Sequence, residues 1–245
     1  MLDNKYEIDW GIFPLIEFIL SNSNELGTKF KNCLDIGSGD GSHSKILADI
    51  GLKTKQIDKY SNSSDIKDDF LDYSFTEKFD VIYCSHVIEH QRNIGNFLDK
   101  IFDLLTDDGK LLIAVPKHSA YRMIEGHINS FLMPLFIQHL IYAGFDLKQG
   151  KYLSCAHIEN AAIVSKASNF SISERKEAGY EWTDLHQERS FIDLKAQDFK
   201  EHTFFYKCEC LTSKDGESIH INKPKDYIPY GVTIKSERFG INITV

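Results

Sequence analysis

The segment Cys33–Gly41 has the pattern of a strand that ends in a ligand-binding turn. Its three glycines alternate with other residues, at Gly37, Gly39 and Gly41. Glycine permits a tight turn and lets a ligand approach where a Cβ would otherwise stand. A helix expected to begin near Ser42 would point its first amides at the same place, which favours a carboxylate or phosphate. The segment therefore predicts a ligand site at this turn.

Two aspartates near the turn restrict the kind of ligand. Enzymes that bind dinucleotides use the spacing G-x-G-x-x-G, which is absent here. Asp35 precedes the first glycine and suits a ligand that carries an ammonium group. Asp58 ends the next apolar strand, where a carboxylate can accept both hydroxyls of a ribose. Alone, Asp58 would be an ordinary solvated aspartate, but together with the glycine turn it indicates a binding role.

A histidine-rich group follows a later strand, with His86, Glu89 and His90 spaced as H-x-x-E-H and His127 further along the chain. Imidazole titrates near neutral pH, so these residues could supply a general base for an alcohol or acid acceptor. Two alternatives stay open: the Glu89-His90 pair could stabilise a short helix, or the group could bind a divalent metal. A metal-free base is favoured, because it needs one well-placed imidazole whereas a metal needs at least three ligands.

Several cationic and polar side chains are expected at the same edge of the sheet as the histidine-rich group. They could meet a phosphate or carboxylate of the acceptor, although solvation is the default for surface charge. These residues are Arg92, Lys117, His118, Tyr121 and Arg122.

The hydrophobic pattern alternates between strands and helices, which implies right-handed crossovers and a mainly parallel sheet covered on both faces. The predicted fold is therefore a doubly wound α/β domain. Residues 59–65 are too short and polar for a helix, so we expect a loop there. The expected strands are 32–36, 54–58, 66–70, 79–84, 110–115, 145–153 and 161–164, and the expected helices are 42–50, 94–105 and 131–142.

The two ends of the chain differ from this pattern. A leading helix is expected over Gly11–Ser21. After Ser168 the sequence becomes polar and then β-rich, with stretches at 202–211, 218–221 and 231–245. We therefore predict two domains, 1–168 and 169–245, in which the second shapes the acceptor site or makes a homodimer contact.

The net charge and the cysteines restrict the expected partners and cellular compartment of the chain. The net charge of -8 argues against electrostatically driven binding of nucleic acid. Neither a signal-peptide pattern nor an apolar run long enough for a membrane span is found. The five scattered cysteines suit a reducing cytoplasm. Cys208 and Cys210 are expected to share one face of a strand rather than to bind zinc.

The order and spacing of these motifs over 32–166 resemble the class I, Rossmann-like methyltransferases that depend on S-adenosylmethionine. The segments that carry the resemblance are Asp35–Gly41, Asp58, Lys67–Leu71, Phe79–His90 and Leu104–Pro116. The resemblance implies a seven-stranded sheet and S-adenosylmethionine as the cofactor.

The resemblance also implies roles for individual residues. Gly37, Ser38, Gly39 and Gly41 would pass around the methionine and ribose portions. Asp35 would organise the amino group, and Asp58, followed by Lys59, would take the ribose. Asp69, with Asp68 as its substitute, would read the adenine edge together with the Phe70 amide. Ser85 would close the site at the end of its strand.

Three functions follow from these residues. The favoured one is O-methylation of a small polar or sugar-like metabolite, with His86, His90 or His127 as the base. The second is RNA 2'-O-methylation, which the acidic charge weighs against. The third is a non-catalytic cofactor-binding subunit that uses its β-rich tail for assembly.

Overall fold

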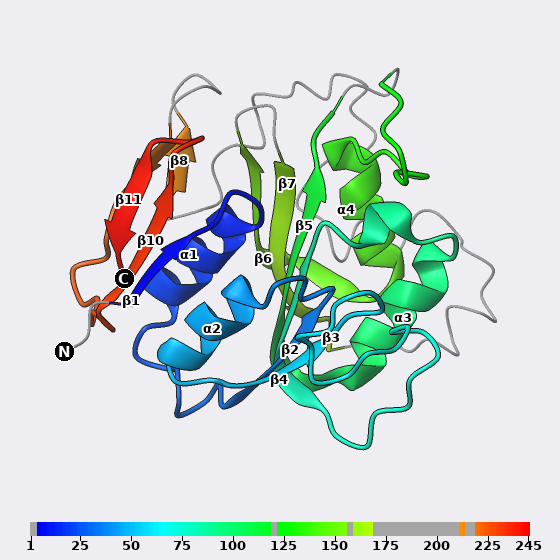
Figure 1. Cartoon of the computed structure of the whole chain (residues 1–245), viewed down its shortest axis with the longest axis horizontal. Helices are drawn as coiled ribbons and strands as arrows, with labels where there is room; N and C mark the ends of the chain where they lie inside the picture. Colours follow the sequence, from blue (N-terminus) through cyan, green and yellow to red (C-terminus); the bar gives the residue numbers. More distant parts are fainter. Residues whose placement is uncertain (1–3, 119–121, 156–158, 169–210, 214–218) are drawn as a thin grey trace.

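The computed structural model describes residues 4–118, 122–155, 159–168, 211–213 and 219–245, and its largest element is a six-stranded sheet (Figure 1). The strand order is β3-β2-β4-β5-β7-β6. The first four of these strands pair in parallel, and β7 pairs antiparallel with both β5 and β6. The predicted doubly wound, mainly parallel fold is confirmed. The strands are β2 (Asn32–Ile36), β3 (Lys53–Ile57), β4 (Phe79–Ser85), β5 (Leu105–Pro116), β6 (Phe145–Cys155) and β7 (Glu159–Lys166).

The prediction of seven strands is wrong in one element, because residues 66–70 form no strand. Ile66 makes only an isolated bridge to Ile57, the last residue of β3. The chain then turns at Asp69, whose carbonyl accepts the N–H groups three and four residues later. Residues 59–65, between the bridge partners, form the predicted loop.

Helices cover both faces of the sheet (Figure 1). Because side chains alternate along a strand, each strand feeds two cores. In β4, Val81 and Tyr83 belong to the core that contains α1 and α2, whereas Ile82 and Cys84 belong to the core that contains α3 and α4. Among the described helices, none is long and apolar enough to cross a membrane. The helices are α1 (Ile12–Ser21), α2 (Ser42–Asp49), α3 (Ile94–Leu104) and α4 (Met133–Tyr142).

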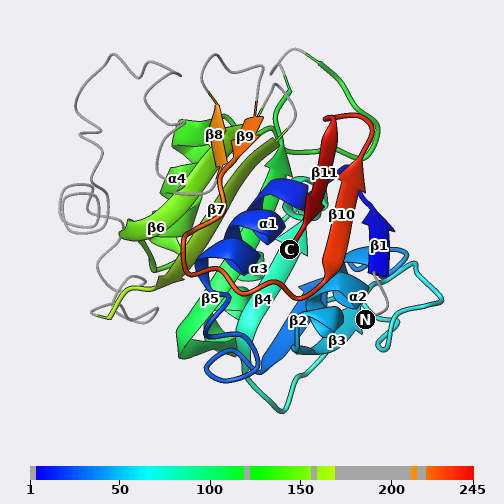
Figure 2. The ribbon, with the colours of Figure 1, turned by 90° about the vertical axis from the view of Figure 1, so that its left-hand side faces the viewer.

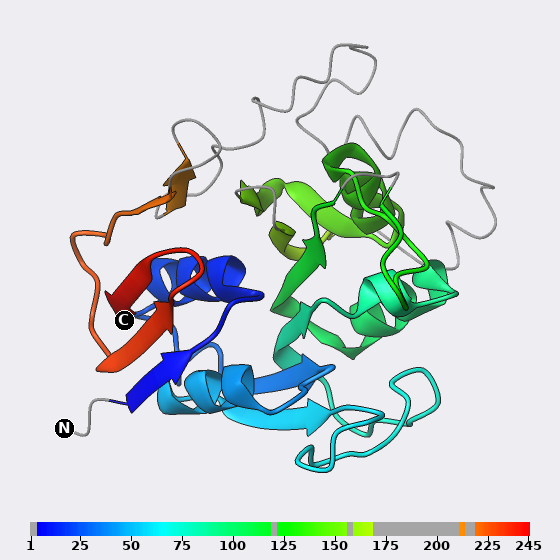
Figure 3. The same ribbon diagram turned by 45° about the horizontal axis from the view of Figure 1, so that its top comes forward.

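Helix α1 confirms the predicted leading helix and is buried on every side from Ile12 to Leu20. A helix that is apolar all round needs a partner on each face. The large sheet lies on one side of α1, and a small three-stranded sheet lies on the other (Figures 2 and 3). The buried carboxylate of Glu17 is paired with Lys151 at 2.8 Å and accepts the Ser21 hydroxyl at 2.9 Å.

The small sheet joins the two ends of the chain (Figure 2). Its central strand, β10 (Val232–Ser236), pairs in parallel with β1 (Asn4–Glu7) and antiparallel with β11 (Ile241–Thr244). Strand β1 was not predicted. Val232 and Ile234 are buried in the same core as α1, so the last strands share a core with the beginning of the chain.

The C-terminal extension, residues 169–245, has two further described strands, β8 (Leu211–Ser213) and β9 (Ile219–Ile221), which pair with each other. The β structure expected over 218–221 and 231–245 is therefore confirmed in the described part. Residues 169–210, which include the expected strand residues 202–210 together with Cys208 and Cys210, lie outside the described residues. The domain boundary at 168 stays a prediction.

Candidate functional site

The glycine turn between β2 and α2 follows a left-handed path. Gly37, Gly39 and Gly41 have φ angles of 72°, 56° and 78°, which residues with a Cβ rarely adopt. A Cβ on Gly37 would lie 2.3 Å from Cγ2 of Val87, so this position also requires glycine for space. Around the position of a Cβ on Gly39 there is no heavy atom within 4 Å among the described residues, so the turn faces open space there. The Ser38 hydroxyl is buried and has no hydrogen-bond partner in the described structure.

Asp58 fixes the glycine turn to the loop after β3. Its carboxylate accepts the N–H groups of Gly39 at 2.9 Å, Tyr60 at 2.7 Å and Ser61 at 2.8 Å. Burial alone would raise the pKa of Asp58, but these three donors outweigh it and lower the pKa. The Ser61 hydroxyl donates back to the Gly39 carbonyl at 2.5 Å. Asp58 is therefore an ionised acceptor at the mouth of the turn, as its predicted role requires.

Asp69 and Phe70 line the same opening as Asp58. Asp69 accepts the Leu71 N–H at 2.9 Å and forms an ion pair with Lys59 at 3.0 Å. Burial opposes ionisation of Asp69, but these two contacts keep its pKa below the usual value. The Phe70 ring packs edge-on against Phe97. The Phe70 N–H donates to no other described residue, so it is available to a ligand.

A cavity of about 700 Å³ connects these residues. We call it the larger cavity. Five of the residues to which the sequence analysis assigned cofactor roles line it: Gly37, Asp58, Lys59, Asp69 and Phe70. The remaining lining residues are Ile36, Ile57, Tyr60, Asp68, Leu71, Val87, His90, Gln91, Arg92, Asn93 and Gly126.

The other residues with predicted cofactor roles, Asp35, Ser38, Gly39, Gly41 and Ser85, do not line the larger cavity. The Asp35 carboxyl is only 1% exposed and accepts the Ser44 hydroxyl of α2 at 2.5 Å. Burial raises its pKa to about 7, and the charges of Asp58 and Asp40 add to this effect against the donation from Ser44. Ser85 ends β4 beside the start of α1 instead.

Gly11 is the residue that brings the start of α1 against β4. Its φ of 69° is left-handed, and its carbonyl accepts the Tyr83 hydroxyl at 3.0 Å. A Cβ on Gly11 would lie 2.0 Å from that hydroxyl and 2.3 Å from the Ser85 oxygen. Glycine is therefore required at this position, and the sequence analysis did not single it out.

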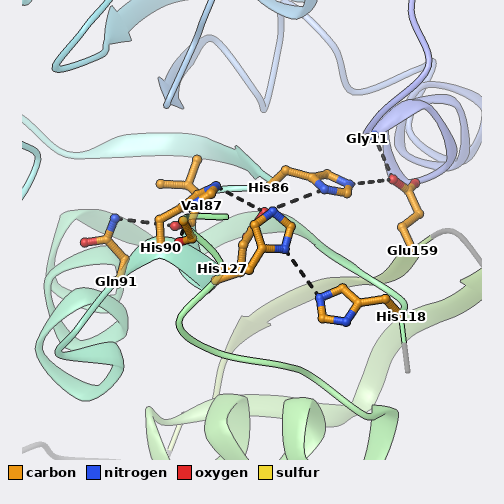
Figure 4. Close-up of polar contacts among 10 residues, drawn as sticks. Gly11, His86, Val87, His90, Gln91, His118, His127 and Glu159 are labelled. Carbon is orange, nitrogen blue, oxygen red and sulfur yellow. Dashed lines mark hydrogen bonds and ion pairs between the residues drawn. The ribbon is translucent and has the colours of Figure 1, made fainter. Parts of the chain in front are cut away.

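His86 stands directly after β4 in a strained backbone conformation, with a φ of 55° (Figure 4). Left-handed φ is uncommon for a residue with a Cβ and persists where the surroundings hold it. Here Glu159 Oε2 lies 3.1 Å from His86 Nε2 and Glu89 Oε1 lies 3.7 Å from Nδ1. Glu159 is fully buried at the start of β7 and also accepts the Gly11 N–H at 2.8 Å.

His86, Glu89 and His90 converge at the end of β4. The short helix considered for the Glu89-His90 pair is a single 3₁₀ turn, Ile88–His90, and no side chain caps it. Glu89 is fully buried, and its Oε1 lies 3.7 Å from both His86 Nδ1 and His90 Nε2. Burial raises the pKa of Glu89 against the opposing influence of the histidines.

His127 joins this group from the loop after β5. Its ring lies edge-on to His90 with centroids 4.9 Å apart, and its Nδ1 is 3.4 Å from His118 Nε2 (Figure 4). Burial lowers the pKa of His127, and the neighbouring imidazoles lower it further. Ligand-capable atoms of Glu89, His90 and His127 lie within 4.8 Å of one another, so these three could also hold a metal ion.

A second cavity of about 500 Å³, here called the smaller cavity, opens beside the histidines. His90 lines both cavities, so the two openings adjoin at this side chain. Arg92 faces the larger cavity, and Tyr121 lies outside the described residues. The residues that line the smaller cavity are Trp10, His86, Glu89, His90, Pro116, Lys117, His118, Arg122, Ile124, His127 and Arg238.

Sequence reasoning missed Trp10, Glu159 and Arg238. Trp10 directly precedes the leading helix, and Glu159 lies just before the expected strand 161–164. Those were the only local signals available for these two residues. Arg238 had none, because its place depends on the pairing of β10 with β1.

Two comparisons with known proteins agree with this architecture. The 1,6-didemethyltoxoflavin-N1-methyltransferase of Burkholderia thailandensis has a TM-score of 0.54 at 15% identity, over 64% of this chain and 79% of that chain. The N-methyltransferase NodS of Bradyrhizobium japonicum WM9 has a TM-score of 0.51 at 18% identity, over 64% and 87%. At these identities the likeness establishes the fold alone.

The sequence itself matches known methyltransferases. The ubiquinone biosynthesis O-methyltransferase of Glaesserella parasuis serovar 5 (strain SH0165) is 30% identical over 120 residues, which cover 40% of this chain and 51% of that relative. The chain thus spans about half the length of the curated relative. Residues 12–206 match the family described as a methyltransferase domain. The chain therefore belongs to the methyltransferase domain family, which confirms the predicted class I S-adenosylmethionine-dependent methyltransferase.

Proposed function

We propose that this chain transfers a methyl group from S-adenosylmethionine to a hydroxyl of a small polar or sugar-like acceptor. When bound, S-adenosylmethionine supplies a methyl group on a positively charged sulfur. One observation carries the proposal: His90 lines both the larger and the smaller cavity, so a ligand in each would meet beside an imidazole. Positioning of this kind supplies much of the catalysis in a direct transfer.

The larger cavity has the donor set that the cofactor needs. Asp58 offers an ionised carboxylate for the ribose hydroxyls, and its backbone donors hold it in place. Asp69 and the unused Phe70 N–H offer an acceptor and a donor to the adenine edge, with Lys59 holding Asp69. We assign the glycine turn, with Ser38, to the methionine and ribose portions. Asp35 and Ser85 do not line the cavity, so we assign them an indirect role in holding the residues that contact the cofactor.

The geometry of His90 supports a role as the general base. Its Nδ1 lies 2.8 Å from the Gly126 carbonyl, which can only accept, so Nδ1 carries the proton. In the neutral ring Nε2, which lies 3.7 Å from Glu89 Oε1, is then the atom that takes a proton from an acceptor hydroxyl. Burial and the neighbouring imidazoles lower the pKa of His127, which disfavours a second positive charge beside His90.

O-methylation is favoured over N-methylation for two reasons. A hydroxyl must lose its proton during the transfer, and the smaller cavity offers a cluster of imidazoles for that step. The curated relative is an O-methyltransferase. An amine acceptor would need less help from a base.

The test uses the purified full chain with methyl-labelled S-adenosylmethionine and paired acceptors that differ only in a hydroxyl or an amine. We expect label on the hydroxyl compounds. His90→Ala should slow transfer about 100-fold or more, the range for a lost acid–base group, in a protein that still binds S-adenosylhomocysteine. His220→Ala, which removes an exposed histidine outside both cavities, is the matched control. Label on the amines alone would contradict the proposal.

A chelator distinguishes the base from a metal held by Glu89, His90 and His127. We expect methyl transfer to be unchanged after treatment with EDTA and dialysis, because the proposed base needs no ion. Loss of transfer that zinc, manganese or nickel restores would assign the three residues to a metal instead.

A further inference from the structure

The smaller cavity has a charge opposite to that of the chain as a whole. The chain has 36 acidic against 28 basic residues and a net charge of -8. Three basic side chains line this cavity: Lys117, Arg122 and Arg238. Glu89, which is fully buried, is the one carboxylate in the lining. A concave surface lined by one sign of charge attracts ligands of the other sign.

Arg238 enters the cavity from the turn between β10 and β11, and the fold fixes that turn. The Ser236 hydroxyl donates to Asp9 at 2.7 Å and accepts the Phe239 N–H at 3.3 Å. The Phe239 ring packs against Phe13 of α1, with centroids 5.3 Å apart. The turn is thus attached to the N-terminal segment at several points, which reduces the entropy lost when its side chain binds a ligand.

The Arg238 guanidinium lies over the Trp10 ring, 4.2 Å from the centroid. Trp10 in turn packs against His86, with centroids 5.0 Å apart. Stacking uses the face of a guanidinium and leaves the N–H groups at its edge free to bind a carboxylate or phosphate. Among the described residues, no carboxylate forms an ion pair with Arg238, so these donors are available.

We propose that Arg238, held on Trp10, recognises an anionic group of the methyl acceptor, either a carboxylate or a phosphate. This inference rests on the proposed function. The acceptor would place its anion at Arg238 and its hydroxyl at the histidines, so the anion sets the orientation. The C-terminal strands then have a direct role in acceptor specificity, because they present Arg238.

Trp10 provides the readout. The chain has two tryptophans, so Trp182→Phe leaves Trp10 as the sole tryptophan fluorophore. In this background the holoprotein, saturated with S-adenosylhomocysteine, is titrated at constant ionic strength with benzoate, inorganic phosphate and neutral benzamide. We expect benzoate or phosphate to change the fluorescence saturably and to bind at least tenfold more tightly than benzamide. The stronger of the two anions identifies the preferred group.

Three variants test the residue. Arg238→Gln should weaken anion binding at least tenfold. Arg238→Lys keeps the positive charge but lacks the planar edge of the guanidinium. Its affinity for the anion should therefore lie between that of Arg238→Gln and that of the parent. Lys225→Gln removes an exposed cation from the same extension outside both cavities and should bind like the parent. Calorimetry repeats each titration, because loss of Arg238 also changes the starting fluorescence.

Two results overturn the proposal: equal affinity for benzoate, phosphate and benzamide, or unchanged anion affinity in Arg238→Gln. A protein that binds S-adenosylhomocysteine but shows either result refutes the anion site alone. A protein that does not bind S-adenosylhomocysteine by calorimetry refutes the proposed function as well.

Discussion

His86 Nε2 lies 3.1 Å from Glu159 Oε2, the same oxygen that accepts the Gly11 N–H at 2.8 Å. One buried carboxylate thus connects the end of β4, the start of β7 and the first turn of α1 (Figure 4). Because His86 has a left-handed backbone, this contact helps to hold a conformation that the residue would otherwise leave. The strained histidine and the N-terminal helix therefore depend on the same group.

Glu159→Gln tests this connection. The amide keeps an oxygen acceptor but loses the charge, so the hydrogen bonds to Gly11 and His86 should weaken. We expect the free energy of unfolding to fall by about 1–3 kcal/mol, the range for hydrogen bonds to a buried charged group. Urea denaturation measures it. Glu7→Gln, at an exposed position in β1, is the control and should change little. Equal stability of both variants would show that Glu159 does not hold the site together.

The parts of the site that the sequence predicted are those set by local chain geometry. The glycine turn and Asp58 follow neighbouring parallel strands, and such strand ends meet at one edge of a sheet. Asp35 was assigned to the ligand side, but it shares a strand face with Cys33 and is covered by α2. The two-residue alternation of a strand could have revealed that burial.

The rest depends on pairing between distant segments. Glu159 belongs to an antiparallel strand inserted after the parallel ones, and Arg238 reaches the site only because β10 pairs with β1. Neither pairing leaves a signal at the residue itself. The missing strand at 66–70 has a local cause instead, because its β-like sequence ends in the turn at Asp69.

Asp58→Asn should weaken cofactor binding with the fold intact. The amide keeps one oxygen for the backbone donors but cannot offer two charged acceptors to the ribose. We expect the Kd for S-adenosylhomocysteine to rise about 10- to 100-fold, which corresponds to roughly 1.4–2.7 kcal/mol. Isothermal titration calorimetry measures the change. Asp108→Asn, on the exposed side of β5, should bind like the wild type. Unchanged affinity in Asp58→Asn would remove Asp58 from the cofactor site.

Asp35 should make stability depend on pH. Burial raises its folded-state pKa to about 7 from 3.8, so between these values the folded protein holds a proton that the unfolded chain has lost. Stability from this group is complete below the unfolded pKa and falls as pH rises through the folded pKa, by up to about 1.4 kcal/mol per pH unit. Asp35→Asn has no carboxyl at this position, so its stability lacks this pH-dependent contribution. Wild type should therefore lose stability relative to Asp35→Asn from about pH 4 to about pH 7. A pH-independent difference in urea denaturation would contradict the assignment.

His127 should titrate below its usual pKa of 6.5, because burial and the neighbouring imidazoles disfavour its charged form. Chemical shifts of the ring protons, followed by NMR against pH, report this value directly without an acceptor. His118→Ala removes one of the neighbouring imidazoles, so the His127 curve should move to higher pH. His220→Ala is the control, since this exposed histidine lies outside both cavities. A His127 curve that stays at or above 6.5 in the wild type would mean that the histidine cluster does not favour a neutral base.

Ile234→Ala tests whether the C-terminal strands are part of the main core. Ile234 is fully buried in β10 within the core that contains α1, and its strand pairs with β1. Truncation leaves a cavity under the small sheet, so the free energy of unfolding should fall by about 2–5 kcal/mol. Ile228→Ala makes the same chemical change at a side chain that is 55% exposed, and its effect should stay within about 0.5 kcal/mol. A single urea transition in Ile234→Ala, shifted without loss of cooperativity, would indicate that the strands unfold together with the sheet. If Ile234→Ala were as stable as Ile228→Ala, the extension would be an independent unit, and Arg238 would lack the rigid support that the anion site requires.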